Sequence, residues 1–463
     1  MKRVAVIGAG LAGSEAAYQL AKRGVHVDLY EMRPEKKSPA HATGDFAELV
    51  CSNSLGADRA TSPAGILKQE LRALDSLVIR CATEARVPAG GALAVDRAHF
   101  SALVTKEIED NPRIAVVRTE VRDFFDVPTI VAAGPLLAGA LAERLKEAVG
   151  HDYLSFFDAA APIVAIDSVD MAHAYRAGRY GQADDYVNCP MNREEYEAFV
   201  AALVAAERVP LHEVDFRGET EPENPNETRR ERNKKFFEGC LPVEVMADRG
   251  IDTLRYGPMR PIGLPDPRTG REPYAVLQLR RDNAEGTLYN MVGFQTNLKW
   301  PEQERVFRMI PALRDAEFVR KGVMHRNTFV CAPLVLDYFL RPRREGGVFR
   351  PDLFLAGQIT GVEGYVESTA CGLVAALNAY ALLCGEEMPV WPRETAIGSL
   401  LHYLQNAEPA SFQPMNVNLG IFPPLEGPAT GKRKKLSKPE RSQAYADRSE
   451  AAMAYFMDRY RIV

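Results

Sequence analysis

The stretch Arg3–Gly13 reads RVAVIGAGLAG, a β-rich run followed by three glycines in a Gly-x-Gly-x-x-Gly spacing. The pattern of Ser14–Arg23 predicts a helix, Gly24 is placed where such a helix ends, and Val25–Tyr30 predicts a second strand. A glycine motif alone is a weak signal. Here it lies between a strand and a helix, as in a nucleotide-binding βαβ unit. The sequence therefore predicts a Rossmann-like α/β fold.

The glycine loop has the residues that a pyrophosphate site requires. Gly8 permits the tight turn, Gly10 lets the backbone approach the pyrophosphate, and Gly13 lets the helix pack close to the sheet. The phosphate would meet the positive end of the helix dipole. Glu31, 18 residues after Gly13, is expected to accept a hydrogen bond from a ribose hydroxyl. The expected cofactor contacts of this loop are Gly8, Ala9, Gly10, Leu11, Ala12 and Gly13.

A second strand–loop–helix unit follows about 350 residues later. Asp352–Ala356 predicts a strand, Gly357–Gly364 is rich in glycine, and Ser368–Leu383 predicts a helix of small residues. FAD is long enough to need two such loops, whereas an NAD site would not require the second. A further predicted strand, Pro128–Ala133, ends at a glycine and is expected to face the nucleotide. These segments add four expected cofactor contacts: Gly134, Gly357, Gln358 and Gly361.

Other local signals predict the remaining organisation. Ser62 and Asp96 are placed as helix N-caps, and Ile114–Arg118 predicts a strand. In the middle, a helix over Arg193–Glu207 and a hairpin of Tyr274–Arg280 with Thr287–Gln295 indicate an α+β insertion. The predicted class is α/β, a glutathione-reductase-like FAD-binding domain with an inserted α+β domain. Its expected parts are residues 1–161 and 326–430 (FAD-binding domain), 162–325 (insertion) and 431–463 (basic C-terminal segment).

Composition is that of a soluble globular chain, with 463 residues of which 46% are hydrophobic and 26% charged. The net charge of −5 argues against a nucleic-acid partner, but its distribution is uneven. Residues 432–463 hold nine Lys/Arg against four Asp/Glu, and Arg229–Lys235 and Arg341–Arg344 form further basic clusters. Such clusters can attract a polyanion, although a charge run is more often a solvated face. Charge alone leaves the partner open.

Membrane and metal functions are not expected. The longest apolar stretch, Val131–Ala142, has 12 residues and contains a proline, so it is too short to cross a bilayer. The N-terminus enters a strand pattern without a secretory signal. Seven cysteines without a CxxC pair and eight scattered histidines form neither a disulfide framework nor a metal-ligand pattern. We expect a reduced, cytoplasmic protein.

Four motifs together carry a family resemblance: Gly8–Gly13, Cys51–Gly56 (CSNSLG), Phe236–Pro242 (FFEGCLP) and Gly357–Tyr365 (GQITGVEGY). From Arg3 to about Tyr380 the chain resembles the bacterial TrmFO family of folate- and FAD-dependent tRNA (uracil-5-)-methyltransferases, which is related to the flavin-dependent enzymes that modify the wobble uridine. The resemblance implies formation of 5-methyluridine at the T-loop uridine (position 54) of tRNA. It implies 5,10-methylenetetrahydrofolate as carbon donor, reduced FAD as reductant, and NADH or NADPH to regenerate it.

The resemblance also assigns catalytic roles to Cys240 and Cys51. Uracil C5 becomes nucleophilic only when a group adds to C6, and a thiolate suits this addition because it can leave again. Gly239 and Pro242 flank Cys240, and Lys234–Lys235 precede it and favour a thiolate, so Cys240 is the preferred nucleophile. Cys51 is then the partner that acts as a base or resolves the adduct. The division of roles between the two stays open.

Several residues are interpreted as structural. His325 is expected to be a hydrogen-bonded histidine rather than a site residue, and Cys189 is left unassigned. Asn297 stands where some family members have a His that could stack on the folate pterin. Because free cysteine is among the most buried residue types, four are interpreted as core residues: Cys81, Cys331, Cys371 and Cys384.

Two other functions are compatible with the sequence. One is an NAD(P)H-dependent flavin oxidoreductase that acts on a small substrate, which would need neither of the two motif cysteines nor a basic surface. The other is a flavin-bearing tRNA-binding protein without turnover, whose tRNA binding would survive the loss of both cysteines.

Overall fold

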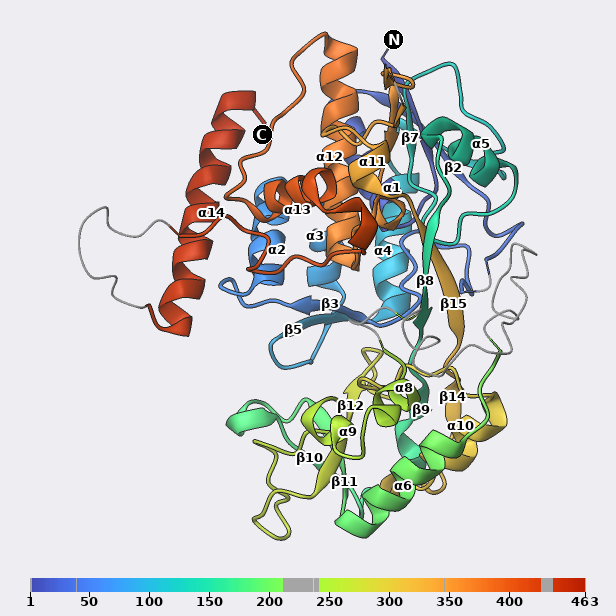
Figure 1. Cartoon of the computed structure of the whole chain (residues 1–463), viewed down its shortest axis with the longest axis vertical. Coiled ribbons are helices and arrows are strands. Elements are labelled where there is room, and N and C mark those ends of the chain that lie inside the picture. The colour runs from blue at the N-terminus through green and yellow to red at the C-terminus, as the bar shows by residue number, and fades with distance from the viewer. Residues whose placement is uncertain are drawn as a thin grey trace.

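The computed structural model describes residues 2–38, 40–210, 236, 241–344, 346–425 and 436–462. Figure 1 shows two parts, an upper part that contains both chain ends and a smaller lower part, with β8 and β15 running between them. Three features of the sequence analysis lie outside the described residues, namely Cys240 and the basic clusters Arg229–Lys235 and Lys432–Lys435.

The upper part is built around a five-stranded parallel sheet in the order β18-β7-β1-β2-β6. The central strands are buried on both faces, as parallel strands covered by helices should be. The predicted strands over Ile114–Arg118 and Arg3–Ile7 are confirmed to the residue. The strands are β1 (Arg3–Ile7), β2 (His26–Glu31), β6 (Ile114–Arg118), β7 (Thr129–Val131) and β18 (Leu353–Leu355).

The two glycine-loop units meet in space. Strand β18 pairs with β7 beside β1, so the segment near residue 354 returns to the N-terminal unit. Helices α1 (Leu11–Lys22) and α12 (Tyr365–Cys384) also pack together. They lie so close that a Cβ at Gly372 would be 2.1 Å from the carbonyl oxygen of Ala12. Helix α12 begins three residues before the predicted Ser368.

Helix α12 is also long and apolar enough to cross a membrane by length and composition, and 78% of its 18-residue apolar window is buried inside the fold. The helix meets this criterion although the longest uninterrupted apolar stretch of the sequence, with 12 residues, is too short to cross a bilayer. Its burial against α1 and the sheet shows that it is a core helix.

The other helices of the upper part begin where the sequence places N-caps. Ser62 Oγ accepts from the N–H of Gly65 and caps α2, and an Asp96 carboxylate oxygen accepts from the N–H of His99 and caps α4. Helix α14 packs on α2 at the edge of the molecule (Figure 1). These elements are α2 (Pro63–Ala73), α3 (Leu77–Glu84), α4 (Arg97–Glu109), α5 (Ala140–Val149), α11 (Ala332–Val335), α13 (Ala396–Asn406), α14 (Lys438–Tyr460), and short strands β3 (Ser54–Ala57), β4 (Arg86–Val87), β5 (Ala92–Val95), β16 (Arg343–Arg344) and β17 (Gly347–Val348).

The lower part contains a six-stranded antiparallel sheet in the order β10-β11-β12-β13-β9-β14. The predicted hairpin is confirmed as β12 and β13, with Arg280 opposite Asn290. Helix α6 starts from a capping box of Asn192 and Glu195. The elements are β9 (Ile163–Ala165), β10 (Tyr175–Arg176), β11 (Tyr186–Met191), β12 (Ala275–Arg281), β13 (Leu288–Met291), β14 (Phe318–Arg320), α6 (Arg193–Ala205), α8 (Val243–Asp248), α9 (Thr253–Tyr256) and α10 (Trp300–Phe307).

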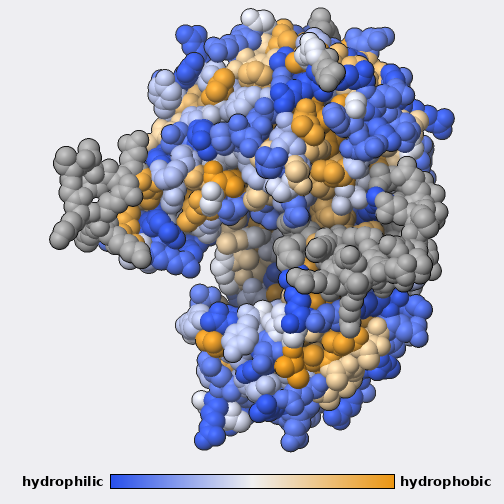
Figure 2. Space-filling model, in the orientation of Figure 1, coloured by the Kyte–Doolittle hydropathy of each residue, from blue (hydrophilic) through white to orange (hydrophobic). Residues whose placement is uncertain are grey.

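Strands β8 (Leu154–Ala159) and β15 (Met324–Phe329) form an antiparallel pair that joins the two parts, and the register places His325 opposite Asp158. No pattern in the sequence had indicated this strand pair. In Figure 2 the surface is hollowed between the upper and lower parts. Our division of the chain at residues 162 and 325 stays a prediction.

Candidate cofactor and active site

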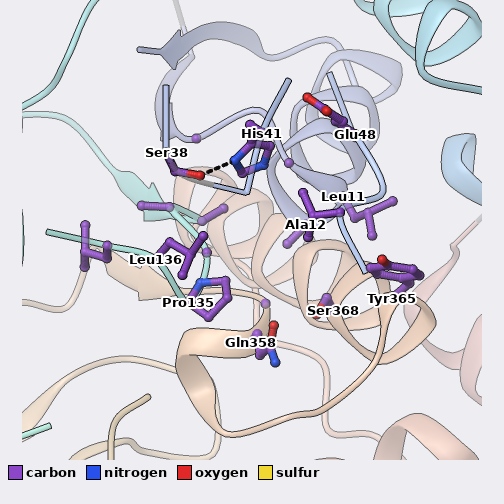
Figure 3. Close-up of a pocket in the computed structure, with 18 of the residues that line it drawn as sticks. Leu11, Ala12, Ser38, His41, Glu48, Pro135, Leu136, Gln358, Tyr365 and Ser368 are labelled. Carbon is purple, nitrogen blue, oxygen red and sulfur yellow. Dashed lines mark hydrogen bonds between the residues drawn. The ribbon is translucent and has the colours of Figure 1, made fainter. Parts of the chain in front are cut away.

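A cavity of about 900 Å³ lies at the carboxyl ends of β1, β2, β7 and β18. Ligand sites of α/β sheets occupy this edge, and the volume falls in the range of cofactor pockets. Figure 3 shows how distant segments converge on it, with Pro135 and Leu136 facing Leu11, Ala12 and Tyr365 across the view. Nine of the residues singled out from the sequence line the cavity: Gly8, Gly10, Leu11, Ala12, Glu31, Cys51, Gly134, Gly357 and Gln358.

The glycines of the first loop differ in what surrounds them. Gly8 has a φ of +99°, and a Cβ there would lie 2.5 Å from the carbonyl oxygen of Ala132. A Cβ at Gly13 would lie 1.7 Å from the carbonyl oxygen of Gly8. A Cβ at Gly10 would meet no atom within 4 Å, and Gly10 lines the cavity. Gly8 and Gly13 therefore shape the loop, while Gly10 leaves bare backbone facing the cavity.

Three expected contacts do not line the cavity: Ala9, Gly13 and Gly361. The N–H of Ala9 donates to a Glu31 carboxylate oxygen at 2.9 Å, so Ala9 acts by fixing the glycine loop to the end of β2. Gly361 has a φ of +91°, and a Cβ there would lie 2.5 Å from Phe412. Glycine is needed at position 361 for the turn and for packing against that ring.

Glu31 lies at the end of β2 and is buried. Besides the bond from Ala9, its carboxylate accepts two hydrogen bonds from the guanidinium of Arg33, at 2.9 and 3.2 Å. Burial acts to raise the pKa of Glu31, but the bonds from Arg33 and from the Ala9 N–H outweigh it and lower that pKa. Glu31 is therefore an ionised hydrogen-bond acceptor at the cavity wall.

Two features of the cavity fit FAD. The N-terminus of helix α1 lies at the cavity wall. Because α1 has no side-chain cap and no acidic residue in its first turn, its N–H groups suit a pyrophosphate. Two cavity-lining residues carry buried polar atoms without a partner in the described part of the chain, His325 Nδ1 and Asn327 Oδ1. A polar ring system placed there would supply hydrogen-bond partners.

Cys51 lies in the cavity wall, where its thiol donates a hydrogen bond to the carbonyl oxygen of Ala159 at 3.6 Å. Burial raises the pKa of the Cys51 thiol, and the nearby carboxylate of Asp158 raises it further. Arg97 and Arg320 act in the opposite direction. The resting group is consequently a neutral thiol, which must give up its proton before it can act as a base or a nucleophile.

Acid–base side chains gather beside Cys51. Asp158 and His325 approach to 3.8 Å between Oδ2 and Nε2, and both are buried. Burial raises the pKa of Asp158 and lowers that of His325. Burial raises the pKa of Glu363 well above its usual value and raises that of Glu367 to about 6. Burial thus raises the pKa of each of these three cavity carboxyls above its ordinary value.

Two interpretations from the sequence were wrong. His325 lines the cavity and its Nδ1 has no partner among the described residues, so it is not a satisfied structural histidine. Cys384 is partly exposed at the end of α12, where it accepts from Lys2 Nζ, whereas Cys81, Cys331 and Cys371 are buried as expected. The helix-periodic pattern placed Cys384 on a core helix but could not show that this last turn reaches the surface.

Other site residues were missed or lie elsewhere. Glu363 and Tyr365 belong to the second glycine-rich motif, which was the available signal for them, whereas nothing local marked Asp158. Asn297 does not line the cavity; its side chain donates to the carbonyl oxygen of Val209 at 2.9 Å. Buried Cys189 lies in strand β11, outside the cavity wall.

The parallel sheet, the two glycine loops and the cavity at their strand ends define a Rossmann-like FAD-binding protein. Comparison with known proteins gives the family. Residues 3–387 match the model of the family described as glucose inhibited division protein A. The chain is 55% identical to the methylenetetrahydrofolate–tRNA-(uracil-5-)-methyltransferase TrmFO of Desulforudis audaxviator, over 98% of each chain. It is 57% identical to the TrmFO of Moorella thermoacetica, over 92% of each.

The chain belongs to the glucose inhibited division protein A family and, within it, to the TrmFO group. A solved structure agrees on the fold. The structure of Aquifex aeolicus GidA superposes with a TM-score of 0.66 at 14% identity, covering 99% of this chain and 75% of that chain.

Proposed function

We propose that this chain is a methylenetetrahydrofolate–tRNA (uracil-5-)-methyltransferase that forms 5-methyluridine at the T-loop uridine, position 54, of tRNA. The observation that carries the proposal is the position of Cys51, which lies in the wall of the cavity that both glycine loops line. The names of relatives that are 52–57% identical over more than nine-tenths of their length support it.

The cofactors follow from the same cavity. When bound, FAD would supply the reducing equivalents, and methylenetetrahydrofolate would supply the carbon. Gly10 and the uncapped N-terminus of α1 would hold the pyrophosphate, and Glu31 would accept from the ribose. NADH or NADPH is the proposed reductant. A reduced cytoplasmic setting fits the free cysteines among the described residues.

The proposed roles of the protein groups follow from what a uracil ring requires. The Cys240 thiolate would add to C6, because a thiolate is a strong nucleophile that can leave again. Cys51 rests as a neutral thiol in the cavity wall; once it has given up its proton, its thiolate would take the proton from uracil C5 or resolve the adduct. Asp158 and His325 line the same cavity, and the Asp158 carboxylate acts on the Cys51 thiol, so this pair would accept the proton that Cys51 gives up.

Nucleoside analysis of cellular tRNA tests the proposal. Total tRNA from a strain that lacks the protein should contain no 5-methyluridine at position 54, and mass spectrometry after complementation should show its return. Complementation with Cys51→Ala should fail. Complementation with Cys81→Ala should succeed, because Cys81 is a buried cysteine away from the cavity. Unchanged 5-methyluridine in the deletion strain would instead favour a flavin oxidoreductase or a tRNA-binding flavoprotein.

A further inference from the structure

The segment Leu49–Asn53 is tethered at every residue. The N–H groups of Cys51 and Ser52 both donate to the hydroxyl of Tyr365, at 2.8 and 3.1 Å. The fully buried Asn53 side chain donates to the carbonyl oxygens of Val95 and Arg281, at 3.0 and 2.9 Å. The remaining tethers come from three arginines, so the backbone position of Cys51 depends on positive side chains.

Two of these arginines belong to the sheet of the lower part. Arg280 of β12 donates to Ser52 Oγ at 2.8 Å and to Asn53 Oδ1 at 3.1 Å. Arg320 of β14 donates to the carbonyl oxygen of Val50 at 3.0 Å. The third arginine, Arg97 of α4, donates to the carbonyl oxygen of Leu49 at 2.9 Å.

The three arginines differ in whether a carboxylate forms an ion pair with them. Arg97 forms an ion pair with Asp282 at 3.2 Å. Within the described residues no carboxylate forms an ion pair with Arg280 or Arg320. Both guanidiniums are largely desolvated, and burial lowers the pKa of each. Asp282 acts on both guanidiniums and Glu48 on Arg320, but neither of these carboxylates forms a direct ion pair with them. A desolvated charge without a direct ion pair is costly, so two such charges beside one thiol favour an anion at that thiol.

We propose that Arg280 and Arg320 are positioning residues for Cys51, which hold its loop from the lower part of the molecule and stabilise the negative charge that its thiol acquires when it gives up its proton. The S–H bond breaks, the proton passes to the neighbouring Asp158–His325 pair, and the thiolate remains beside two guanidinium groups that form no ion pair within the described residues. This inference rests on the proposed function only for the step in which that thiolate is used.

Alkylation of Cys51 in the FAD-loaded full-length protein tests the proposal. Iodoacetamide reacts with the thiolate, so below the thiol pKa the rate at a fixed pH is proportional to the thiolate fraction. The rate is measured at several pH values by mass spectrometry of the peptide that contains Cys51, which separates it from Cys240. Arg320→Gln, Arg320→Lys and Arg308→Gln are compared with the wild type.

Arg308→Gln is the matched control, because Arg308 lies in the same part of the molecule and donates a single hydrogen bond to a carbonyl oxygen, that of Ala316. We expect Arg320→Gln to slow alkylation by about tenfold at each pH, which corresponds to a rise of about one unit in the thiol pKa. Arg320→Lys should keep most of the rate, and Arg308→Gln should keep all of it.

An alkylation rate of Cys51 that is unchanged or higher in Arg320→Gln would overturn the proposal. An arginine that is only a structural tether would loosen the loop when replaced, and Cys51 would then react equally fast or faster at every pH. Arg280→Lys provides a second variant should Arg320→Gln fold poorly; it should react at nearly the wild-type rate, and faster alkylation there would contradict the proposal in the same way. The alkylation rate does not depend on tRNA, so a failed methylation assay would leave this test valid.

Discussion

The hydroxyl oxygen of Tyr365 lies 2.8 Å from the backbone nitrogen of Cys51, although 314 positions separate the two residues in sequence. The same hydroxyl accepts from the N–H of Ser52 at 3.1 Å. Tyr365 is the first residue of α12 and follows the second glycine-rich loop. One side chain of the second cofactor unit thus fixes the backbone of the cysteine motif that follows the first unit.

Removing that hydroxyl should loosen the Cys51 loop. Tyr365→Phe leaves two N–H groups without their acceptor, and each buried unpaired donor costs about 1–3 kcal/mol. We expect the free energy of unfolding to fall by about 2 kcal/mol, measured by urea denaturation. Tyr403→Phe is the control, because the Tyr403 hydroxyl donates to the carbonyl oxygen of Gln413 at an exposed position where water can replace it. Equal losses of unfolding free energy in the two variants would show that the hydrogen bonds to Tyr365 stabilise the fold no more than an exposed hydrogen bond does.

Substitutions at two glycines of the first loop, Gly10 and Gly13, should have different effects. Gly10→Val should fold normally, because its φ of −71° suits any residue and a Cβ there meets no atom within 4 Å, but the side chain would occupy the pyrophosphate position. FAD affinity should drop at least about tenfold. Gly13→Ala should instead lower the free energy of unfolding by about 3 kcal/mol, because its Cβ clashes with the Gly8 carbonyl. Flavin absorbance and thermal unfolding distinguish the effects of the two variants. Full flavin occupancy in Gly10→Val would refute the assignment of Gly10 to the pyrophosphate site.

Much of the fold was predictable because its signals are local. A strand, a glycine loop and a helix are adjacent in sequence, so the boundaries of β1 and the N-caps Ser62 and Asp96 could be predicted to the residue. The hairpin of β12 and β13 was found for the same reason. Each of these elements depends on side-chain periodicity or on one capping residue.

The rest of the site depends on pairings over long distances in sequence. Arg320 reaches Val50 across 270 positions, and β15 places Asn327 beside Asp158 across 169. A lone histidine in a polar strand has no local feature that separates a core residue from a site residue. The unpartnered Nδ1 of His325 becomes visible only when β8 and β15 are paired.

Stability should depend on pH through Glu70. This buried carboxylate accepts hydrogen bonds from the N–H of Ile397 at 2.9 Å and from Ser449 Oγ at 2.6 Å, joining α2 to α13 and α14. Burial raises its pKa to about 7 from an ordinary 4.5. Between pH 4.5 and 7 the native state therefore holds a proton that the unfolded chain has lost, so stability falls as pH rises through that window.

The comparison with Glu70→Gln isolates this effect. From pH 5 to pH 8 the free energy of unfolding of the wild type should decrease relative to the variant by up to about 3 kcal/mol. The exposed Glu84→Gln should show no such divergence in urea denaturation at the same two pH values. Parallel pH profiles for wild type and Glu70→Gln would mean that Glu70 titrates normally in the folded protein.

The two basic clusters Arg229–Lys235 and Lys432–Lys435 should contribute to tRNA affinity. Each phosphate contact adds about 0.9 to the slope of log affinity against log salt for duplex nucleic acid. Neutralising both clusters should weaken tRNA binding and flatten that slope, as measured by filter binding at several salt concentrations. NAD(P)H oxidation by the flavoprotein should be unaffected. An unchanged slope would show that the clusters are solvated surface.

We propose that two cysteines of this chain transfer a folate-derived carbon to uracil in tRNA. The most direct test uses purified FAD-loaded protein, NADPH, unmodified tRNA transcript and methylenetetrahydrofolate labelled in its methylene carbon. We expect labelled 5-methyluridine at position 54 of the tRNA, and none with a transcript that carries cytidine there. Cys51→Ala and Cys240→Ala should also give none, although both should bind FAD and tRNA. Unlabelled tRNA alongside continued NADPH oxidation by the wild type would contradict it.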